Sequence, residues 1–89
     1  MKTLKIKIYG TVQGVGFRYS TSQQAEKLNL SGWVKNEADG SVSAEVTGED
    51  SDVDSFEKWC SSGPSSAKVE KVESEEKPME KYHKFEVKH

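Results

Sequence analysis

The stretch LKIKIYGTVQGVGFR, residues 4–18, joins three kinds of local pattern. Apolar and polar residues alternate from Leu4 to Tyr9, which is typical of a strand with one buried face. Three glycines then interrupt the alternation, and from Arg18 to Leu30 apolar side chains recur at helical spacing. The stretch therefore predicts a strand, a glycine-rich loop and a helix in direct succession.

Turn residues divide the chain after this helix. Ser31-Gly32 is expected to end the helix, and a second strand is expected over residues 33–37. Asp39-Gly40 predicts a tight hairpin whose two central residues both have positive φ. A third strand follows the hairpin and ends at Gly48.

The next segment predicts a second helix. Ser51 and Asp54 have the spacing of a capping box at its start, and Gly63-Pro64 is a typical helix ending. The expected buried face of this helix consists of Val53, Phe56 and Cys60, with Trp59 beside it.

The last part of the chain is expected to form two strands. The fourth strand begins near Ala67, and a change of phase between Val69 and Val72 predicts a bulge. Residues 73–81 are highly charged and are expected to leave the sheet as an exposed excursion, after which residues 85–87 form a short final strand.

This order of elements predicts an α+β fold: a ferredoxin-like two-layer α/β sandwich (βαββαβ) with two helices on one face of an antiparallel sheet. The first two strands are expected to be parallel, with the third between them. Their carboxyl ends then lie at the same sheet edge, roughly 10 Å apart. An arginine at position 18 and the amide of Asn36 would meet there over a small ligand.

Composition narrows the class of protein. The 89 residues allow one small domain, residues 1–89, and the net charge of −2 argues against a chain whose main task is to hold nucleic acid. A single cysteine excludes an internal disulfide, and no apolar run is long enough for a signal peptide or a membrane span. We therefore expect a cytoplasmic monomer with neither a nucleic-acid nor a membrane partner.

The glycine-rich loop has the features of an anion site. Glycines allow successive N–H groups to point into one hollow, and the start of a helix adds unpaired donors. Arg18 is the only arginine beside twelve lysines, and its planar fork matches two phosphate oxygens. A tight turn followed by an ordinary surface arginine is the alternative. A P-loop is excluded because no lysine follows these glycines.

These residues also carry a family resemblance. Residues 10–18, GTVQGVGFR, resemble the signature G-x-V-Q-G-V-x-F-R of the acylphosphatases, and residues 32–36, GWVKN, resemble their second motif. Residues 39–42 and 63–69 resemble further family segments. The similarity extends over essentially the whole chain.

The resemblance implies a hydrolase that cleaves the carboxyl–phosphate bond of acyl phosphates into a carboxylate and inorganic phosphate. It implies no metal and no cofactor, and it makes inorganic phosphate a product inhibitor. Arg18 and Asn36 become the catalytic residues, with Asn36 orienting the attacking water. The expected phosphate-binding residues are Gln13, Gly14, Val15, Gly16, Phe17 and Arg18.

Two residues depart from the common family pattern. Glu37 places a carboxylate directly after Asn36, although strand alternation directs it to the other face. His89 stands where many members end near an aromatic residue.

Two alternative functions remain open at this point. One is an acylphosphatase-like domain of a larger maturation factor. The other is a non-catalytic ferredoxin-like binding module. RNA binding by such a module uses aromatic residues on the open sheet face, where the sequence places Tyr9 between lysines and little else aromatic.

Overall fold

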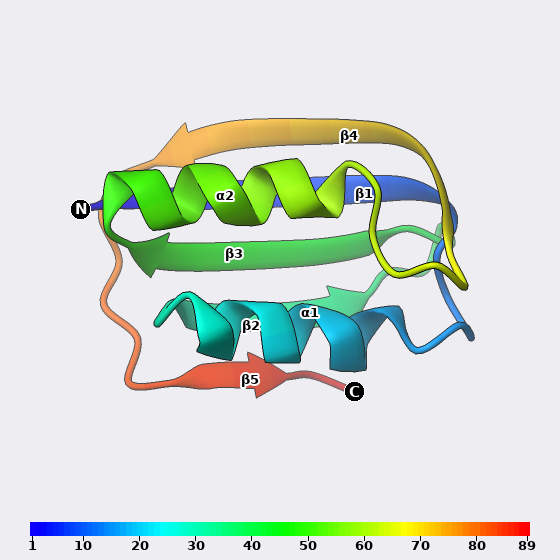
Figure 1. Ribbon diagram of the computed structural model, residues 1–89, viewed down its shortest axis with the longest axis horizontal. Coiled ribbons are helices and arrows are strands. Elements are labelled where there is room, and N and C mark those ends of the chain that lie inside the picture. The colour runs from blue at the N-terminus through cyan, green and yellow to red at the C-terminus, as the bar shows by residue number, and fades with distance from the viewer.

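The computed structural model describes residues 1–89, which form a five-stranded sheet with two helices on one face (Figure 1). In chain order the elements are β1 (Lys2–Thr11), α1 (Phe17–Lys27), β2 (Ser31–Asn36), β3 (Val42–Gly48), α2 (Asp50–Cys60), β4 (Lys68–Lys77) and β5 (Phe85–Val87).

The strand order is β4-β1-β3-β2-β5. β1 and β2 both pair antiparallel with β3, so they are parallel to each other with β3 between them, as predicted. The short β5 pairs parallel with β2. The sheet is therefore mixed, and the expectation of a purely antiparallel sheet is corrected at this edge.

The core lies between the sheet and the helices. Alternate residues of β1 and β3, including Ile6, Ile8 and Ala44, are fully buried against the buried faces of α1 and α2. The face predicted for α2 is confirmed, because Val53 and Phe56 have no exposed surface. This packing fixes both helices over the sheet, so the start of α1 is held beside the end of β2.

The end of α1 differs from the prediction. The helix ends at Lys27, and Asn29 adopts a left-handed conformation (φ 56°). The N–H of Leu30 donates to the carbonyl of Ala25 over 2.9 Å, the bond that characterises a Schellman motif. Asparagine tolerates this conformation, so the helix ends before Ser31-Gly32, and these two residues begin β2.

The β2–β3 hairpin also differs. The N–H of Glu37 donates to the carbonyl of Ser41 (2.9 Å), and the N–H of Gly40 donates back to the carbonyl of Glu37 (3.2 Å). This is a three-residue loop in which only Gly40 has positive φ (91°), and the two-residue turn is wrong. The carboxylate of Asp39 accepts bonds from the Ser41 N–H (3.0 Å) and hydroxyl (2.6 Å), which stabilises the longer loop.

The capping box predicted for α2 does not form. The cap residue is Glu49, which makes no side-chain bond to the helix, and Ser51 lies inside the first turn. Asp50 and Asp52 in that turn place negative charge at the positive end of the helix dipole instead.

β4 contains the predicted bulge but continues further than predicted. Tyr9 pairs with Lys71 and Gly10 pairs with Val69, so Glu70 is the extra residue. The charged residues 73–77 remain paired with β1, and the predicted excursion at 73 is wrong. A row of charged side chains is common on an edge strand, where it discourages pairing with other chains.

The open face of the sheet carries more aromatic side chains than predicted. Trp33 lies there beside Glu45, and the hydroxyl of Tyr82 donates to the Glu45 carboxylate. Desolvation, together with this bond, raises the pKa of Tyr82 to about 12. Tyr9 is therefore one of three aromatic residues on this face.

Candidate active site

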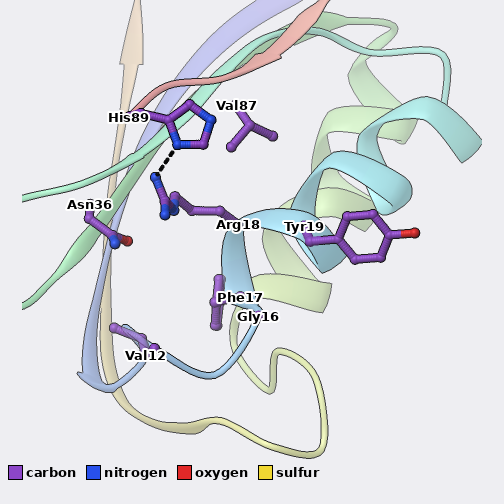
Figure 2. A pocket seen from close by; sticks show the side chains of 9 residues that line it. Val12, Gly16, Phe17, Arg18, Tyr19, Asn36, Val87 and His89 are labelled. Atoms are coloured by element: carbon purple, nitrogen blue, oxygen red, sulfur yellow. Dashed lines mark hydrogen bonds between the residues drawn. The ribbon is translucent and has the colours of Figure 1, made fainter.

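A cavity of about 370 Å³ opens at the sheet edge where β1 and β2 end (Figure 2). Four segments meet there: the loop after β1, the first turn of α1, the end of β2 and the residues around β5. The cavity is lined by Val12, Gly14, Gly16, Phe17, Arg18, Tyr19, Asn36, Val87 and His89.

The loop presents unpaired backbone donors at this cavity. Gly14 and Gly16 are left-handed (φ 75° each), and Gly16 is the N-cap of α1. The first helical bond runs from the N–H of Ser20 to the carbonyl of Gly16, so the seven N–H groups of residues 13–19 donate to no other group of the protein. Such a run of free donors at a helix start is an anion-binding arrangement.

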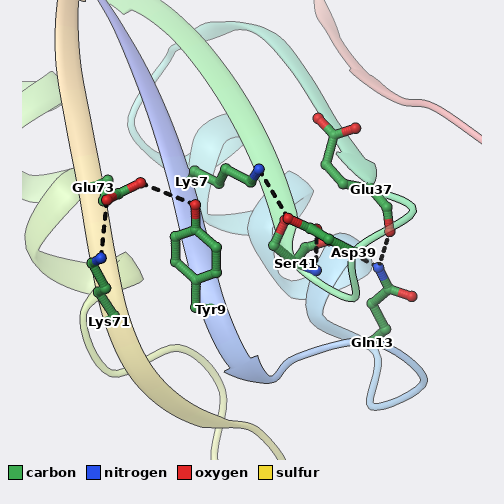
Figure 3. A network of polar contacts seen from close by, with 8 residues as sticks. All are labelled: Lys7, Tyr9, Gln13, Glu37, Asp39, Ser41, Lys71 and Glu73. Atoms are coloured by element: carbon green, nitrogen blue, oxygen red, sulfur yellow. Dashed lines mark hydrogen bonds and ion pairs between the residues drawn. The ribbon is translucent and has the colours of Figure 1, made fainter.

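The loop is fixed from outside the cavity. The side-chain amide of Gln13 donates to the carbonyls of Glu37 and Ser41, both over 2.8 Å, and so ties the loop to the β2–β3 hairpin (Figure 3). The hydroxyl of Ser66 donates to the carbonyl of Val15 (2.7 Å). These bonds orient the loop while its own N–H groups remain free.

Arg18 is positioned by the chain after β5. Its Nη1 donates to the carbonyl of Lys88 over 2.7 Å and lies 3.4 Å from Nδ1 of His89. The N–H of Lys88 in turn donates to the carbonyl of Val34 (2.8 Å), which anchors this segment to β2. No carboxylate forms an ion pair with Arg18. Because Nη1 is already bonded to the Lys88 carbonyl, the N–H groups of Nε and Nη2 remain free to donate to one ligand together.

Asn36 stands at the end of β2 on the helix-covered side. Strand alternation places it in phase with the buried Gly32 and Val34, and its own side chain is exposed. Asn36 lines the cavity, and Figure 2 shows its side chain to the left of the guanidinium of Arg18. The side chain of Glu37 does not line the cavity, in keeping with its place on the opposite face.

The structure separates the residues predicted for phosphate binding into two groups. Gly14, Gly16, Phe17 and Arg18 line the cavity, and Asn36 joins them. Gln13 and Val15 do not line it. The ring of Phe17 is buried and packs against Trp59, with 5.7 Å between ring centroids.

Sequence reasoning missed four lining residues: Val12, Tyr19, Val87 and His89. The last two reach the cavity because β5 pairs with β2. The alternation of Phe85 and Val87 located the strand, but nothing in the local sequence gave its partner.

Other candidate chemistry is absent from this region. No three His, Cys, Asp or Glu side chains lie together in a group that could hold a metal ion. Cys60 is buried in the core, and this burial raises the pKa of its thiol far above the ordinary range. Neither helix has the length and apolar composition that crossing a bilayer requires.

Comparisons with known proteins agree on one family. The model of the acylphosphatase family matches residues 4–87. An acylphosphatase of Acaryochloris marina is 45% identical over 84 residues, covering 94% of this chain and 90% of the relative. An acylphosphatase of Rubrobacter xylanophilus is 49% identical over 77 residues, covering 86% of this chain and 70% of the relative.

Solved structures show the same likeness. The crystal structure of acylphosphatase from Bacillus subtilis superposes with a TM-score of 0.96 at 36% identity and covers both chains completely. Full-length HypF, in its phosphate- and nucleotide-bound form, matches with a TM-score of 0.87 at 30% identity, covering 99% of this chain and 12% of that one. With the family match spanning nearly its whole length, this chain belongs to the acylphosphatase family and is a hydrolase of acyl phosphates.

Proposed function

We propose that the cavity beside Arg18 is where the acyl phosphate is hydrolysed, and that residues 13–18 hold its phosphoryl group. The observation that carries this proposal is the run of seven free N–H groups next to an arginine without an acidic partner. Backbone donors fixed before the substrate arrives need no reorganisation when charge develops on the phosphoryl oxygens.

Arg18 supplies the full positive charge of the site. Its free Nε and Nη2 fork matches two phosphoryl oxygens, whereas a lysine ammonium offers no such planar pair. The Lys88 carbonyl holds the other end of the guanidinium, so little side-chain freedom is lost on binding.

The reaction requires few further groups. The leaving carboxylate has a conjugate acid with a pKa of about 4, so it departs without a general acid. Phosphoryl transfer then depends on charge neutralisation and on an attacking water in line with the breaking bond. The Asn36 amide holds this water, and the phosphoryl group itself takes up the proton. No step needs a metal or a cofactor.

We also propose the molecular setting. Inorganic phosphate, the product, occupies the same donors and inhibits. Residues 1–89 act as one domain and as a cytoplasmic monomer, which fits a single cysteine that is buried and free.

The experiment that tests this function compares wild type with Asn36→Ala in the hydrolysis of benzoyl phosphate, followed by loss of ester absorbance. We expect kcat to fall by an amount equivalent to about 2–4 kcal/mol, the effect of deleting one preorganised polar group. The inhibition constant of inorganic phosphate should change little, because the loop and Arg18 are intact.

Lys35→Ala is the matched control, because Lys35 precedes Asn36 and faces the open side of the sheet, where it lies over Trp33. It should retain wild-type kcat. A wild-type protein without acyl phosphate hydrolysis would refute the function. A tenfold rise of the phosphate inhibition constant in Asn36→Ala, with kcat nearly unchanged, would make Asn36 a phosphate ligand instead.

A further inference from the structure

The chain after β4 crosses the whole sheet before it reaches the cavity. Residues 78–84 join β4, at one edge of the sheet, to β5, at the other edge. Figure 1 shows this connection running past the end of the sheet at which β1 begins. β5 has only three residues and pairs with a single neighbour, β2. Because so short an edge strand makes few bonds of its own, its placement depends on what holds the segments before and after it.

Two buried polar side chains on the open face of the sheet hold this connection. The N–H of Glu80 donates to the hydroxyl of Thr3 over 2.9 Å, and the hydroxyl of Tyr82 donates to the carboxylate of Glu45. Thr3 has no exposed surface, and only 7% of the surface of Glu45 is exposed. No cationic side chain forms an ion pair with Glu45. A buried carboxylate needs hydrogen-bond donors, so the bond to Tyr82 is a firm anchor.

Backbone bonds continue from this anchor to Arg18. The carbonyl of Lys84, two residues after Tyr82, accepts a bond from the N–H of Gly32 over 3.0 Å. β5 follows directly, and beyond it the N–H of Lys88 donates to a carbonyl of β2 over 2.8 Å. The carbonyl of Lys88 then accepts the bond from Nη1 of Arg18 (2.7 Å). The same extended segment therefore begins at the anchor and ends at the acceptor that orients the guanidinium.

β5 has one further contact, which lies in the core. The rings of Phe85 and Phe56 have their centroids 6.4 Å apart. This contact holds the strand against the helix layer independently of Tyr82. Loss of the Tyr82 anchor should therefore displace β5 slightly without releasing it, and the protein should remain folded.

We propose that Tyr82 is a positioning residue for acyl phosphate hydrolysis: its bond to Glu45 sets the place of β5, and the Lys88 carbonyl then sets the orientation of the Arg18 guanidinium. This inference rests on the proposed function, because it takes from it the role of Arg18 as a phosphoryl ligand. A planar fork binds two phosphoryl oxygens only within a narrow range of orientations, so a small displacement of its acceptor lowers the rate.

The first test measures kcat/KM for benzoyl phosphate in Tyr82→Phe, which removes only the hydroxyl. We expect a fall of about fivefold, and circular dichroism verifies that the variant is folded. Glu45→Ala removes the acceptor of the same bond and should cause a similar fall. The matched control is Tyr9→Phe, because the hydroxyl of Tyr9 also donates to a carboxylate on the open face, that of Glu73 over 3.0 Å, but beside β4. This control should stay within about twofold of wild type.

A double-mutant cycle separates positioning from stability. In Arg18→Lys the ammonium has no plane to orient, so adding Tyr82→Phe should change kcat/KM by less than about twofold. A residue that only stabilises the fold would lower the folded fraction in both backgrounds, and the loss of about fivefold would persist in Arg18→Lys.

The outcomes distinguish this inference from the function on which it rests. Suppose that wild type hydrolyses benzoyl phosphate and Arg18→Lys is impaired. The positioning role is then refuted alone if Tyr82→Phe and Glu45→Ala stay within about twofold of wild type, or if their loss is equally large in the Arg18→Lys background. Should one of these two variants fail to fold, the other decides by the same criterion. If wild type does not hydrolyse benzoyl phosphate, the proposed function fails and the positioning role fails with it.

Discussion

Cationic side chains have different partners at the cavity and on the open face of the sheet. Arg18 donates to the backbone carbonyl of Lys88 and lies beside the ring of His89, and no carboxylate pairs with it. On the open face, Lys7 pairs with Asp39 over 3.0 Å and Lys71 pairs with Glu73 over 3.1 Å (Figure 3). The lysines are neutralised within the fold, whereas the arginine is oriented without being neutralised. Its charge has no acidic partner within the fold.

Aromatic rings extend this contrast. The ammonium groups of Lys35 and Lys88 lie 5.3 and 5.1 Å from the ring centroid of Trp33. A cation–π contact at an exposed site contributes about 0.5–1 kcal/mol of stabilisation, so each of these contacts holds a lysine on the open face only weakly. On this surface Lys7, Lys35, Lys71 and Lys88 already have an acidic or aromatic partner.

The largest effect is expected when the two kinds of cation are exchanged between the cavity and the open face. Arg18→Lys should lower kcat/KM for benzoyl phosphate about 10- to 150-fold, the effect of losing a hydrogen bond to a charged group worth about 1.5–3 kcal/mol. The charge is kept, so the loss reports on the fork. Lys7→Arg, the reverse exchange on the open face, should leave kcat/KM unchanged. A lysine variant that keeps more than about a tenth of wild-type kcat/KM contradicts this role of Arg18.

The effect of bound phosphate on thermal stability should be smaller, and it tests the loop directly. Inorganic phosphate at ten times its dissociation constant should stabilise the folded state by about 1.4 kcal/mol. For a chain of this size, that corresponds to a rise in Tm of about 5–10 °C, measured by differential scanning calorimetry. Lys35→Ala should show the same rise, and Arg18→Lys a much smaller one. An unchanged Tm in saturating phosphate would exclude the loop as an anion site.

The smallest expected effect concerns the open face and acid. The Ser41 hydroxyl and N–H, with the Lys7 ammonium, hold the pKa of the Asp39 carboxyl well below its usual range. A carboxyl with a lowered folded-state pKa stabilises the fold above its unfolded pKa, about 3.9, and that contribution is lost as the pH falls towards the folded-state value.

Urea unfolding should therefore find Asp39→Asn less stable than wild type at pH 6. The difference should narrow as the pH falls below about 4. Asp52→Asn, on the first turn of α2, should not reproduce this pH dependence. A gap between Asp39→Asn and wild type that is constant from pH 6 to pH 3 would contradict the linkage.

Local patterns in the sequence predicted the features that neighbours along the chain determine. Alternation from Leu4 to Tyr9 located β1, and the change of phase after Val69 located the bulge of β4. The glycines before Arg18 predicted a loop that leads directly into a helix. The free N–H groups of that loop follow from backbone conformation alone, so they were accessible from residue types.

Contacts between distant residues were not predictable in this way. Gln13 reaches carbonyls 24 and 28 residues away, and Arg18 bonds to a carbonyl 70 residues away. No spacing in the sequence marks such a pair, because a backbone carbonyl is present at every position. The charged residues 73–77 likewise gave no strand pattern, since pairing with β1 rather than burial keeps them in the sheet.

The bond between Arg18 and the Lys88 carbonyl also links activity to the order of protein synthesis. The loop, α1 and β2 leave the ribosome long before residue 88 is made, so the backbone hollow is able to form early. The guanidinium acquires its orienting partner only when β5 has been translated and has docked beside β2. Under the proposed role of Arg18, full activity should therefore appear only after the last strand has left the ribosome and docked beside β2.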